Sequence, residues 1–326
     1  MSTLKWHLFG ISALIFMLTS CNIGNKHVII YEDFPKKQVL YADSVPTKAI
    51  YDNVFMNLAN GTLVISSFKA DTMMHFYSTP SLEYEFGDGI KGHGHNEVQS
   101  FPSFCQSADK YLYVRGFTEN TIKKFSLSNT GIKELKCYGI ALDAVPNDMH
   151  IINDSLLYYN DLGNTEIKSY NLNNRRICHR YNLCDTYRTK DKDALVGSFC
   201  ANNDIAIYAF QYKREIVVLR TDDLSYIKTI KWNGTDNDKL GKQHTKGQKL
   251  FYTYAVASPK YFYLLYRGIS PTDSESHYFI EKYDKEMNPV CKYDIGREIY
   301  KFAADETNGY IYAMGNSDEY IYKYKM

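Results

Sequence analysis

A pattern of paired, aromatic-rich strand segments recurs along this chain and limits its fold more than any other feature. The second segment of each pair is the clearest, and its second residue falls at Leu63, Leu112, Leu156, Ala206, Phe262 and Ile311. These markers lie 49, 44, 50, 56 and 49 residues apart. A strand-only repeat of roughly 40–50 residues is typical of a β-propeller with one blade per repeat. The sequence therefore predicts an all-β, six-bladed β-propeller.

Each repeat divides into four strands, named a to d from the propeller axis outward. In the fourth repeat we expect them at Gly197–Ala201, Ile205–Ala209, Glu215–Arg220 and Tyr226–Trp232. The sixth repeat supplies only three strands before the chain reaches Met326, whereas an unassigned segment, Gln38–Ala42, precedes the first blade. Because an unclosed ring would expose a blade edge, we expect this N-terminal strand to complete the last blade and close the ring.

The composition narrows the class of protein. The repeat runs through most of the 326 residues, which favours one large domain, and the 30 tyrosines favour strands over helices. Lysine and arginine (38) nearly balance aspartate and glutamate (37), so the chain lacks the positive field that recruits nucleic acid. We expect no nucleic-acid partner, no cofactor and a monomeric propeller.

The N-terminus has the layout of an export signal. Lys5 precedes an apolar run from Leu8 to Leu18, and Leu18-Thr19-Ser20-Cys21 follows. The tetrapeptide resembles a bacterial lipobox, which implies cleavage before Cys21 and lipidation of that residue; the alternative is a secretory signal with an accidental cysteine. We expect a signal peptide over 1–20, the lipidated Cys21 with a polar tether over 21–36, and the propeller over 37–326. The predicted location is the bacterial envelope, with the outer membrane favoured and the leaflet face left open.

Six further cysteines permit 15 pairings in an oxidising compartment. Cys105 and Cys200 fall at matching points in innermost strands, and Cys137, Cys178 and Cys291 fall in outermost strands of different blades. We therefore expect mostly buried free thiols. Only Cys178 and Cys184 are close enough along the chain to pair locally.

Long connections are confined to one face of the predicted ring. The b–c loops and d–a connections leave on this face, and the a–b and c–d turns on the other are short. The long segments are Gly87–Gln99, Asp185–Leu195, Asn233–Lys249 and Gly268–Ser276. Long loops on a rigid scaffold often carry function, so we expect a binding surface here, although insertions also accumulate simply where they are tolerated.

The glycine-rich segment from Gly87 to Glu97 is the most unusual of these loops. His93, His95 and Glu97 alternate in a way that places them on one side of an extended backbone, as metal ligands require. A lone His-x-His is weak evidence, and a glycine-shaped crossover packed over the channel is the favoured interpretation. We therefore predict no metal, and keep the three residues as candidates for ligand binding.

Three further candidates fall at the ends of b strands. Arg115 and Arg267 occupy matching positions in the second and fifth repeats, and Asp161 lies in the equivalent part of the third. Arginines at the top of the channel are suited to gripping a carboxylate or sulfate in a bidentate geometry. The alternative is that they are exposed or paired within the protein.

The lipobox, the tether, the degenerate blades and the pattern Gly92-x-Gly94-x-x-Glu97 together resemble the TolB-like, six-bladed propeller lipoproteins of Bacteroidetes. His95 stands where that family often has proline. The resemblance implies a binding or scaffold role, and it supplies no catalytic residues. We expect a non-catalytic envelope protein that binds a protein or small ligand through the b–c/d–a face. The alternative is a carbohydrate-active enzyme or lectin, with a glycan bound at the top of the channel.

Overall fold

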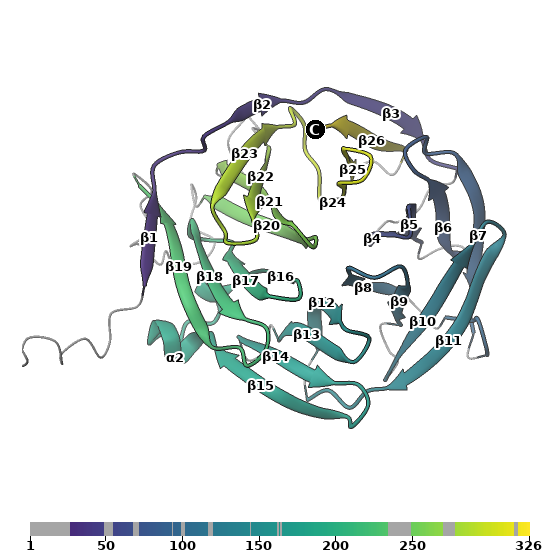
Figure 1. Cartoon of the computed structure of the whole chain (residues 1–326), viewed down its shortest axis with the longest axis horizontal. Helices are drawn as coiled ribbons and strands as arrows, with labels where there is room; N and C mark the ends of the chain where they lie inside the picture. Colours follow the sequence, from purple (N-terminus) through teal and green to yellow (C-terminus); the bar gives the residue numbers. More distant parts are fainter. Residues whose placement is uncertain are drawn as a thin grey trace, which may run out of the picture.

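The computed structural model shows a closed ring built almost wholly of strands (Figure 1). The residues that it describes are 27–48, 55–67, 72–92, 94–98, 102–116, 120–143, 145–161, 163, 165–233, 249–269, 278–315 and 319–326. Within these ranges the strands form five sheets that divide into six four-stranded antiparallel units, each with its first strand nearest the axis, because a short parallel pairing of β8 with β12 joins the second and third units. The β-propeller prediction is confirmed.

The units follow one another around the ring in sequence order. The first contains β4 to β7 (Met56–Ala59, Thr62–Ser66, Thr72–Ser78, Tyr84–Ile90) and the second β8 to β11 (Ser103–Ser107, Leu112–Arg115, Thr121–Ser128, Gly131–Gly139). The third contains β12 to β15 (Pro146–Ile152, Leu156–Asp161, Glu166–Asn171, Arg176–Asn182) and the fourth β16 to β19 (Gly197–Ala201, Ile205–Phe210, Glu215–Arg220, Tyr226–Trp232). The fifth contains β20 to β23 (Leu250–Ala257, Tyr261–Ile269, Phe279–Asp284, Pro289–Asp294). The sixth contains β24, β25 and β26 (Lys301–Asp305, Tyr310–Met314, Tyr320–Lys325) with β3 (Ala42–Pro46).

Apolar side chains pack between neighbouring units rather than in one central core. A separate hydrophobic cluster lies at each junction around the ring, from the first and second units through to the fifth and sixth. A further cluster joins the sixth unit to the first and includes Leu63, Tyr77 and Tyr312. Because each sheet is packed on both faces, its strands are apolar on both sides, which is why the sequence shows little alternation.

The strand that closes the ring is not the one predicted. β3 pairs antiparallel with β26, from Tyr320 opposite Pro46 to Tyr324 opposite Ala42. The predicted closing segment, Gln38–Ala42, overlaps β3 only at Ala42. The closure of the last unit by an N-terminal strand is therefore confirmed, but its position is shifted toward the C-terminus.

Two more N-terminal strands lie outside the ring and form, with β3, a belt over residues 28–46 (Figure 1). β1 (Val28–Tyr31) pairs in parallel with β19, and β2 (Lys37–Val39) pairs in parallel with β23. Between them Phe34 is 5% exposed and stacks on Trp232, with ring centroids 4.7 Å apart. The part of the expected tether from Val28 onward thus lies against the ring, where backbone pairing and one buried aromatic ring hold it to the fourth unit, while Val28 and Ile30 keep their side chains exposed.

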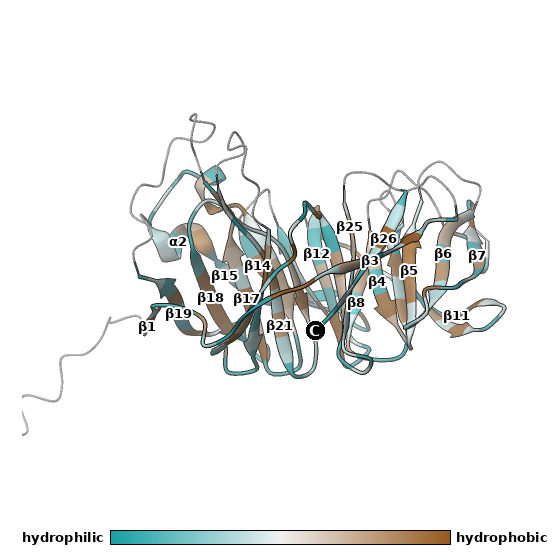
Figure 2. Cartoon of the chain, turned by 90° about the horizontal axis from the view of Figure 1, so that it is seen from above, coloured by the Kyte–Doolittle hydropathy of each residue, from teal (hydrophilic) through white to brown (hydrophobic). Residues whose placement is uncertain are grey.

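The two faces of the ring differ where the structure describes them; of the predicted long segments, 233–249 and 268–276 lie mostly outside the described residues. At the fourth unit, the a–b and c–d turns lie on one side and touch, because Thr221 Oγ1 donates to the carbonyl of Asn203. We call this side the a–b face. The d–a connections leave on the opposite side, the d–a face, where the helix α2 (Leu183–Tyr187) and the 3-10 turn η1 (Asp193–Leu195) lie between β15 and β16 (Figure 2).

Two further expectations concern the cysteines and the membrane. Cys105 in β8 and Cys200 in β16 are fully buried, as predicted for innermost strands, and Cys291 is buried as well. Cys137 and Cys178 are exposed, against the expectation of mostly buried thiols, because they lie in the outermost strands β11 and β15. In the described part of the chain, no helix is both long and apolar enough to cross a bilayer.

Candidate functional site

Asp161, one of the residues predicted to line the top of the channel, lies in a buried ion-pair network. Its carboxylate is 2.7 Å from the ammonium of Lys168, and both side chains are fully buried. Lys168 also contacts Asp143 at 2.9 Å and Glu166 at 3.1 Å. Burial alone would lower the pKa of Lys168, but hydrogen bonds to Asp161, Asp143 and Glu166 raise it above its usual value. The ion pairs of Lys168 therefore join β14 to β13, which carries Asp161, and to the connection before β12, which carries Asp143.

The two predicted arginines are also packed within the protein. Arg267 donates to the hydroxyl of Tyr278 at 2.6 Å and lies 3.3 Å from the carboxylate of Glu298. Arg115 is 9% exposed at the end of β9, where its backbone carbonyl accepts a hydrogen bond from Ser103. Arg115, Asp161 and Arg267 thus lie in three different units, and Asp161 and Arg267 face different partners.

The glycine-rich loop is held by its own glutamate. The carboxylate of Glu97 accepts a hydrogen bond of 2.7 Å from the backbone N–H of Gly94. A Cβ atom at Gly92 would lie 2.1 Å from the same carboxylate. The pattern Gly92-x-Gly94-x-x-Glu97 therefore has a structural explanation, because the glycines leave the space that the glutamate fills.

Side chains of the second unit contact this loop and hold it in place. The ammonium of Lys123, itself 7% exposed, donates to the carbonyls of Gly94 and Glu97 at 2.9 and 2.7 Å. His95 Nδ1 lies 3.6 Å from Glu134. His93 lies outside the described residues, and within them no group of three or more histidine, cysteine, aspartate or glutamate side chains could hold a metal ion.

Glu281, which the sequence did not single out, is a second buried charge whose partners all lie within the protein. Glu281 in β22 is fully buried and contacts Arg214 at 2.8 Å. Its second oxygen accepts hydrogen bonds from the hydroxyls of Tyr252 and Tyr283 at 3.2 and 2.6 Å. Burial is the main cause that raises the pKa of Tyr252, with the charge of Glu281 next. This cluster joins the fourth unit to the fifth.

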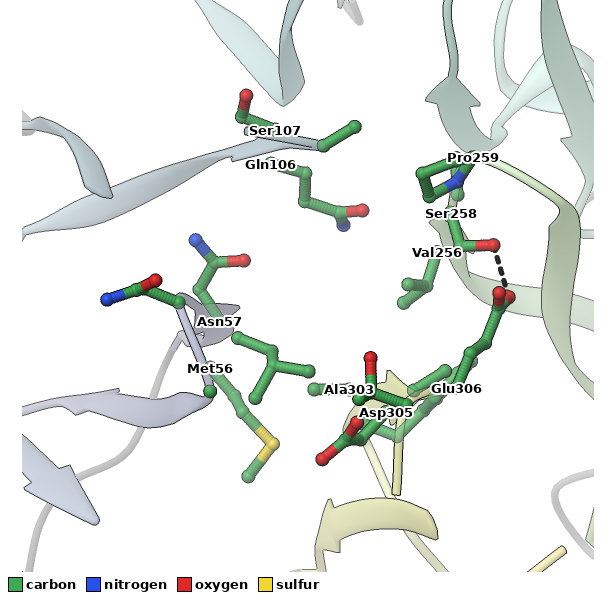
Figure 3. Close-up of a pocket in the computed structure, with 18 of the residues that line it drawn as sticks. Met56, Asn57, Gln106, Ser107, Val256, Ser258, Pro259, Ala303, Asp305 and Glu306 are labelled. Atoms are coloured by element: carbon green, nitrogen blue, oxygen red, sulfur yellow. Dashed lines mark hydrogen bonds between the residues drawn. The ribbon is translucent and has the colours of Figure 1, made fainter. Parts of the chain in front are cut away.

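A cavity of about 570 Å³ lies in the central channel (Figure 3). Strands a and a–b turns of the first, second, fifth and sixth units line it, so its mouth is at the a–b face. We call it the channel pocket. Its apolar wall is made by Met56, Leu58, Tyr254, Val256, Phe302 and Ala303, and its polar side chains are Asn57, Gln106, Ser107, Asp109, Ser258, Lys260, Asp305, Glu306, Thr307 and Asn308.

The carboxylates of the channel pocket are all engaged by neighbouring protein groups. Asp109 accepts a hydrogen bond of 2.7 Å from the hydroxyl of Tyr113. Asp305 accepts from the side chain of Asn308 at 2.8 Å. Glu306 accepts a short hydrogen bond from Ser258, marked in Figure 3, and another of 3.3 Å from Tyr263. These contacts fix the carboxylates as acceptors at the rim.

The amide side chains of the pocket are placed differently. Asn57, on β4, points into the cavity in Figure 3 and is 8% exposed. Gln106 Nε2 donates 3.3 Å across the channel to the carbonyl of Ala255, which ties the second unit to the fifth. Amide groups both donate and accept, so this lining suits a ligand with neutral polar groups.

Above the pocket the channel is filled by charged and aromatic side chains. The ammonium of Lys301 lies 4.1 Å from the ring centroid of Tyr254. Burial lowers the pKa of Lys301, while the facing charge of Asp148 acts in the opposite sense. Burial likewise raises the pKa of Asp148, which accepts a 2.9 Å hydrogen bond from the backbone of Phe199. Lys301 and Asp148 thus lie toward the d–a end of the channel, whereas the turns that line the pocket place its mouth at the a–b face.

Sequence reasoning did not find the channel pocket. Its rim is made of Asn, Asp, Ser and Gly in short turns, which are the residues that any β-turn favours. The fold and this pocket define a class: an all-β propeller with a pocket at one end of its channel.

Comparison with solved structures agrees with that class and goes no further than the fold. An exported protein of Bacteroides fragilis aligns over 91% of this chain and 98% of its own, with 13% identity and a TM-score of 0.55. A member of the DUF4221 family from Bacteroides vulgatus aligns over 88% and 97%, with 11% identity and a TM-score of 0.56. A streptogramin B lyase aligns over 88% and 97%, with 12% identity and a TM-score of 0.54. No family model and no curated protein matches the chain.

Proposed function

We propose that this protein is an exported, lipid-anchored propeller of the bacterial envelope that binds a small polar ligand in the channel pocket without chemical turnover. The export signal and Cys21 support the anchor, and two structural neighbours from Bacteroides, one of them an exported protein, have the same fold. The lipobox and the glycine pattern favour a TolB-like lipoprotein of the outer membrane.

The proposal rests on one difference within the pocket: its carboxylates are bonded to protein groups, whereas its amides have atoms available to a ligand. Asp109, Asp305 and Glu306 are held by protein donors, whereas a general acid or base must reach the proton that it transfers. The amide of Asn57, the amide oxygen of Gln106 and the apolar wall remain for a ligand, since only the nitrogen of Gln106 is bonded to Ala255. A cavity of about 570 Å³ is within the range of small-molecule sites.

The d–a face is the second candidate, as a surface for an envelope protein. The observation in its favour is that lysines hold its connections in place: Lys123 donates hydrogen bonds to carbonyls of the glycine loop, and Lys168 forms an ion pair with the crossover before β12. An ordered loop surface binds without a large ordering cost.

A thermal-shift screen of the purified ectodomain against neutral monosaccharides, oligosaccharides, amino acids and small organic acids tests the pocket. We expect a neutral polar compound to raise the melting temperature, and calorimetry to give its affinity. Asn57→Leu removes a donor and an acceptor and lowers that affinity about tenfold, since a lost hydrogen bond costs about 1–2 kcal/mol.

The matched control is Asn174→Leu, which makes the same change at an exposed turn between β14 and β15. Its affinity for the ligand stays at the parent value. If Asn57→Leu and Asn174→Leu bind the ligand with equal affinity, the ligand does not bind in the channel pocket. Cleavage of a glycan from the panel would instead support the enzyme alternative, and binding of a glycan without cleavage would support a lectin.

The anchor has its own test. Cells that express the full chain and are fed a radiolabelled fatty acid should incorporate label into the parent protein and not into Cys21→Ser. Equal labelling of the two proteins contradicts lipidation at this residue. Separation of inner and outer membranes then locates the labelled protein.

A further inference from the structure

The belt fixes the point at which the N-terminal chain reaches the ring. The carbonyl of His27 accepts hydrogen bonds from the backbone of Thr229 at 2.9 Å and from the hydroxyl of Tyr226 at 3.1 Å. Tyr226 is the first residue of β19 and directly follows the c–d turn of its unit. Because β1 runs parallel to β19, the first residue of β1 lies at the end of that strand nearer the a–b face.

The mouth of the channel pocket lies on this same face. Its rim comprises the a–b turns at Asn60, Asp109, Ser258 and Glu306. The a–b and c–d turns of one unit lie together, as the bond from Thr221 to Asn203 shows for the fourth unit. The entry of the chain and the pocket mouth therefore share one side of the ring, and α2 lies on the other.

The length of chain before His27 is short. Five residues lie between His27 and Cys21, which makes six residue steps, and a fully extended chain spans at most about 3.3–3.6 Å per step, or roughly 20 Å. A strand of six residues, typical of the blades, is itself about 20 Å long. An anchor at Cys21 therefore keeps the a–b side of the fourth unit within about one blade height of the lipid surface.

We infer that the a–b face, with the mouth of the channel pocket, is turned toward the membrane that holds the lipid anchor, and that the d–a face is turned away from it. The inference rests on the proposed lipidation of Cys21. It deepens the proposed function, because a ligand then enters the pocket from the space between the ring and the bilayer. The near balance of charges means that the tether, rather than attraction of the ring to lipid, sets this orientation.

The test uses the full lipidated chain in vesicles of phosphatidylethanolamine and phosphatidylglycerol. The exposed thiols are first removed by Cys137→Ser and Cys178→Ser. A donor dye is then attached through Lys110→Cys, in an a–b turn, or through Lys190→Cys, beside α2 on the d–a face; both lysines are exposed. Energy transfer to an acceptor on the lipid headgroups reports the distance of each dye from the bilayer, and the parent without an added cysteine gives the background.

We expect transfer from position 110 to exceed that from position 190 by about twofold, since the two dyes differ in height by roughly one strand length of 20 Å. Position 110 lies in the second unit, away from the anchored fourth unit. A ring standing on the edge of its fourth unit would therefore give the greater transfer at 190. Equal transfer at the two positions, or greater transfer at 190, overturns the inference.

Two controls separate this outcome from failure of the anchor. The parent floats with the vesicles and Cys21→Ser does not; if the parent fails to float, both the anchoring proposal and the inference are wrong. Insertion of twenty Gly/Ser residues between Asn22 and Lys26 should keep flotation and abolish the difference between the two dyes. A difference that survives the insertion shows that something other than tether length orients the ring, and also overturns the inference.

Discussion

The two faces of this ring use polar residues in opposite ways. On the d–a face, charged side chains such as Asp161 and Lys123 form ion pairs or hydrogen bonds with other groups of the protein. On the a–b face ordinary turn residues surround a cavity, and Asn57 points into it. The comparison teaches that conspicuous charged residues can serve architecture, while a pocket is lined by residues that attract no notice in the sequence.

Both faces depend on a closed ring, so removing the closing strand should have the largest effect. Deletion of residues 22–46 takes away β1, β2 and β3 and leaves the sixth unit with an unpaired edge at β26. We expect loss of cooperative unfolding, because the whole stability of a domain is only about 5–15 kcal/mol. Deletion of 22–41 keeps β3 and loses Phe34, and should cost about 3–5 kcal/mol with cooperativity retained. Similar urea melts for the two truncations would show that β3 does not close the ring.

The structural role of the d–a charges is tested by Lys168→Met. The change leaves Asp161 fully buried without its ammonium partner, and breaking such a pair costs about 3–5 kcal/mol. Urea unfolding measures the loss, and Lys190→Met, at an exposed position on the same face, should cost less than about 0.5 kcal/mol. If Lys168→Met lowers the free energy of unfolding by less than about 1 kcal/mol, the charges of the d–a face do not have the structural role assigned to them.

Between the faces, His150 makes the ring sensitive to acid. It is 2% exposed, and burial lowers its pKa to about 3, whereas an unfolded histidine titrates near 6.5. The unfolded chain therefore binds the proton more readily, so this contribution to stability is complete above about pH 6.5 and declines as the pH falls toward 3. The decline reaches about 2 kcal/mol at pH 5.

Urea unfolding at pH 7.5 and pH 5 measures this decline. His150→Leu should lose about 2 kcal/mol less than the parent between the two pH values, because it has no such group to protonate. The same change at exposed His179 should leave the parent's decline intact. Equal declines in the parent and His150→Leu would exclude His150 as the source.

The smallest effect is expected in the channel pocket. Asn57→Leu replaces a mostly buried amide with an apolar side chain of similar size, beside Met56 and Leu58. We expect a change in unfolding free energy within about 0.5 kcal/mol, or a small gain, since polar groups kept for binding often cost stability. A loss of more than about 2 kcal/mol in urea would place Asn57 among the architectural residues and make the two faces alike.

Strand periodicity made most of the fold predictable. In the fourth unit the predicted and observed strands differ only at Phe210, because turn residues and apolar runs define both ends of each strand locally. The belt was not predictable in the same way. Val39 and Tyr41 alternate like a buried strand but are 56% and 86% exposed. β2 is held by backbone pairing to β23, and such pairing has no signature in side-chain pattern.

The candidate site was predictable only as a list of unusual residues. The sequence could not show that Lys168 lies 2.7 Å from Asp161, because neither residue type specifies its partner. It could not show the channel pocket either, because the turns around it are far apart in sequence and become neighbours only when the ring closes. The prediction of a metal-free glycine loop was favoured on the residues alone, and the bond from Gly94 to Glu97 gives a physical reason for the glycines.

The position of the C-terminus has a practical consequence for anyone who handles this protein. The backbone N–H of Met326 donates to the carbonyl of Gly309, in the a–b turn of the sixth unit. A purification tag or fluorescent protein fused after Met326 would therefore project on the side of the pocket mouth, where, on the binding and orientation proposed above, it would obstruct the ligand and hold the ring away from the bilayer. A reporter inserted near Lys190 would sit on the opposite side and leave both undisturbed.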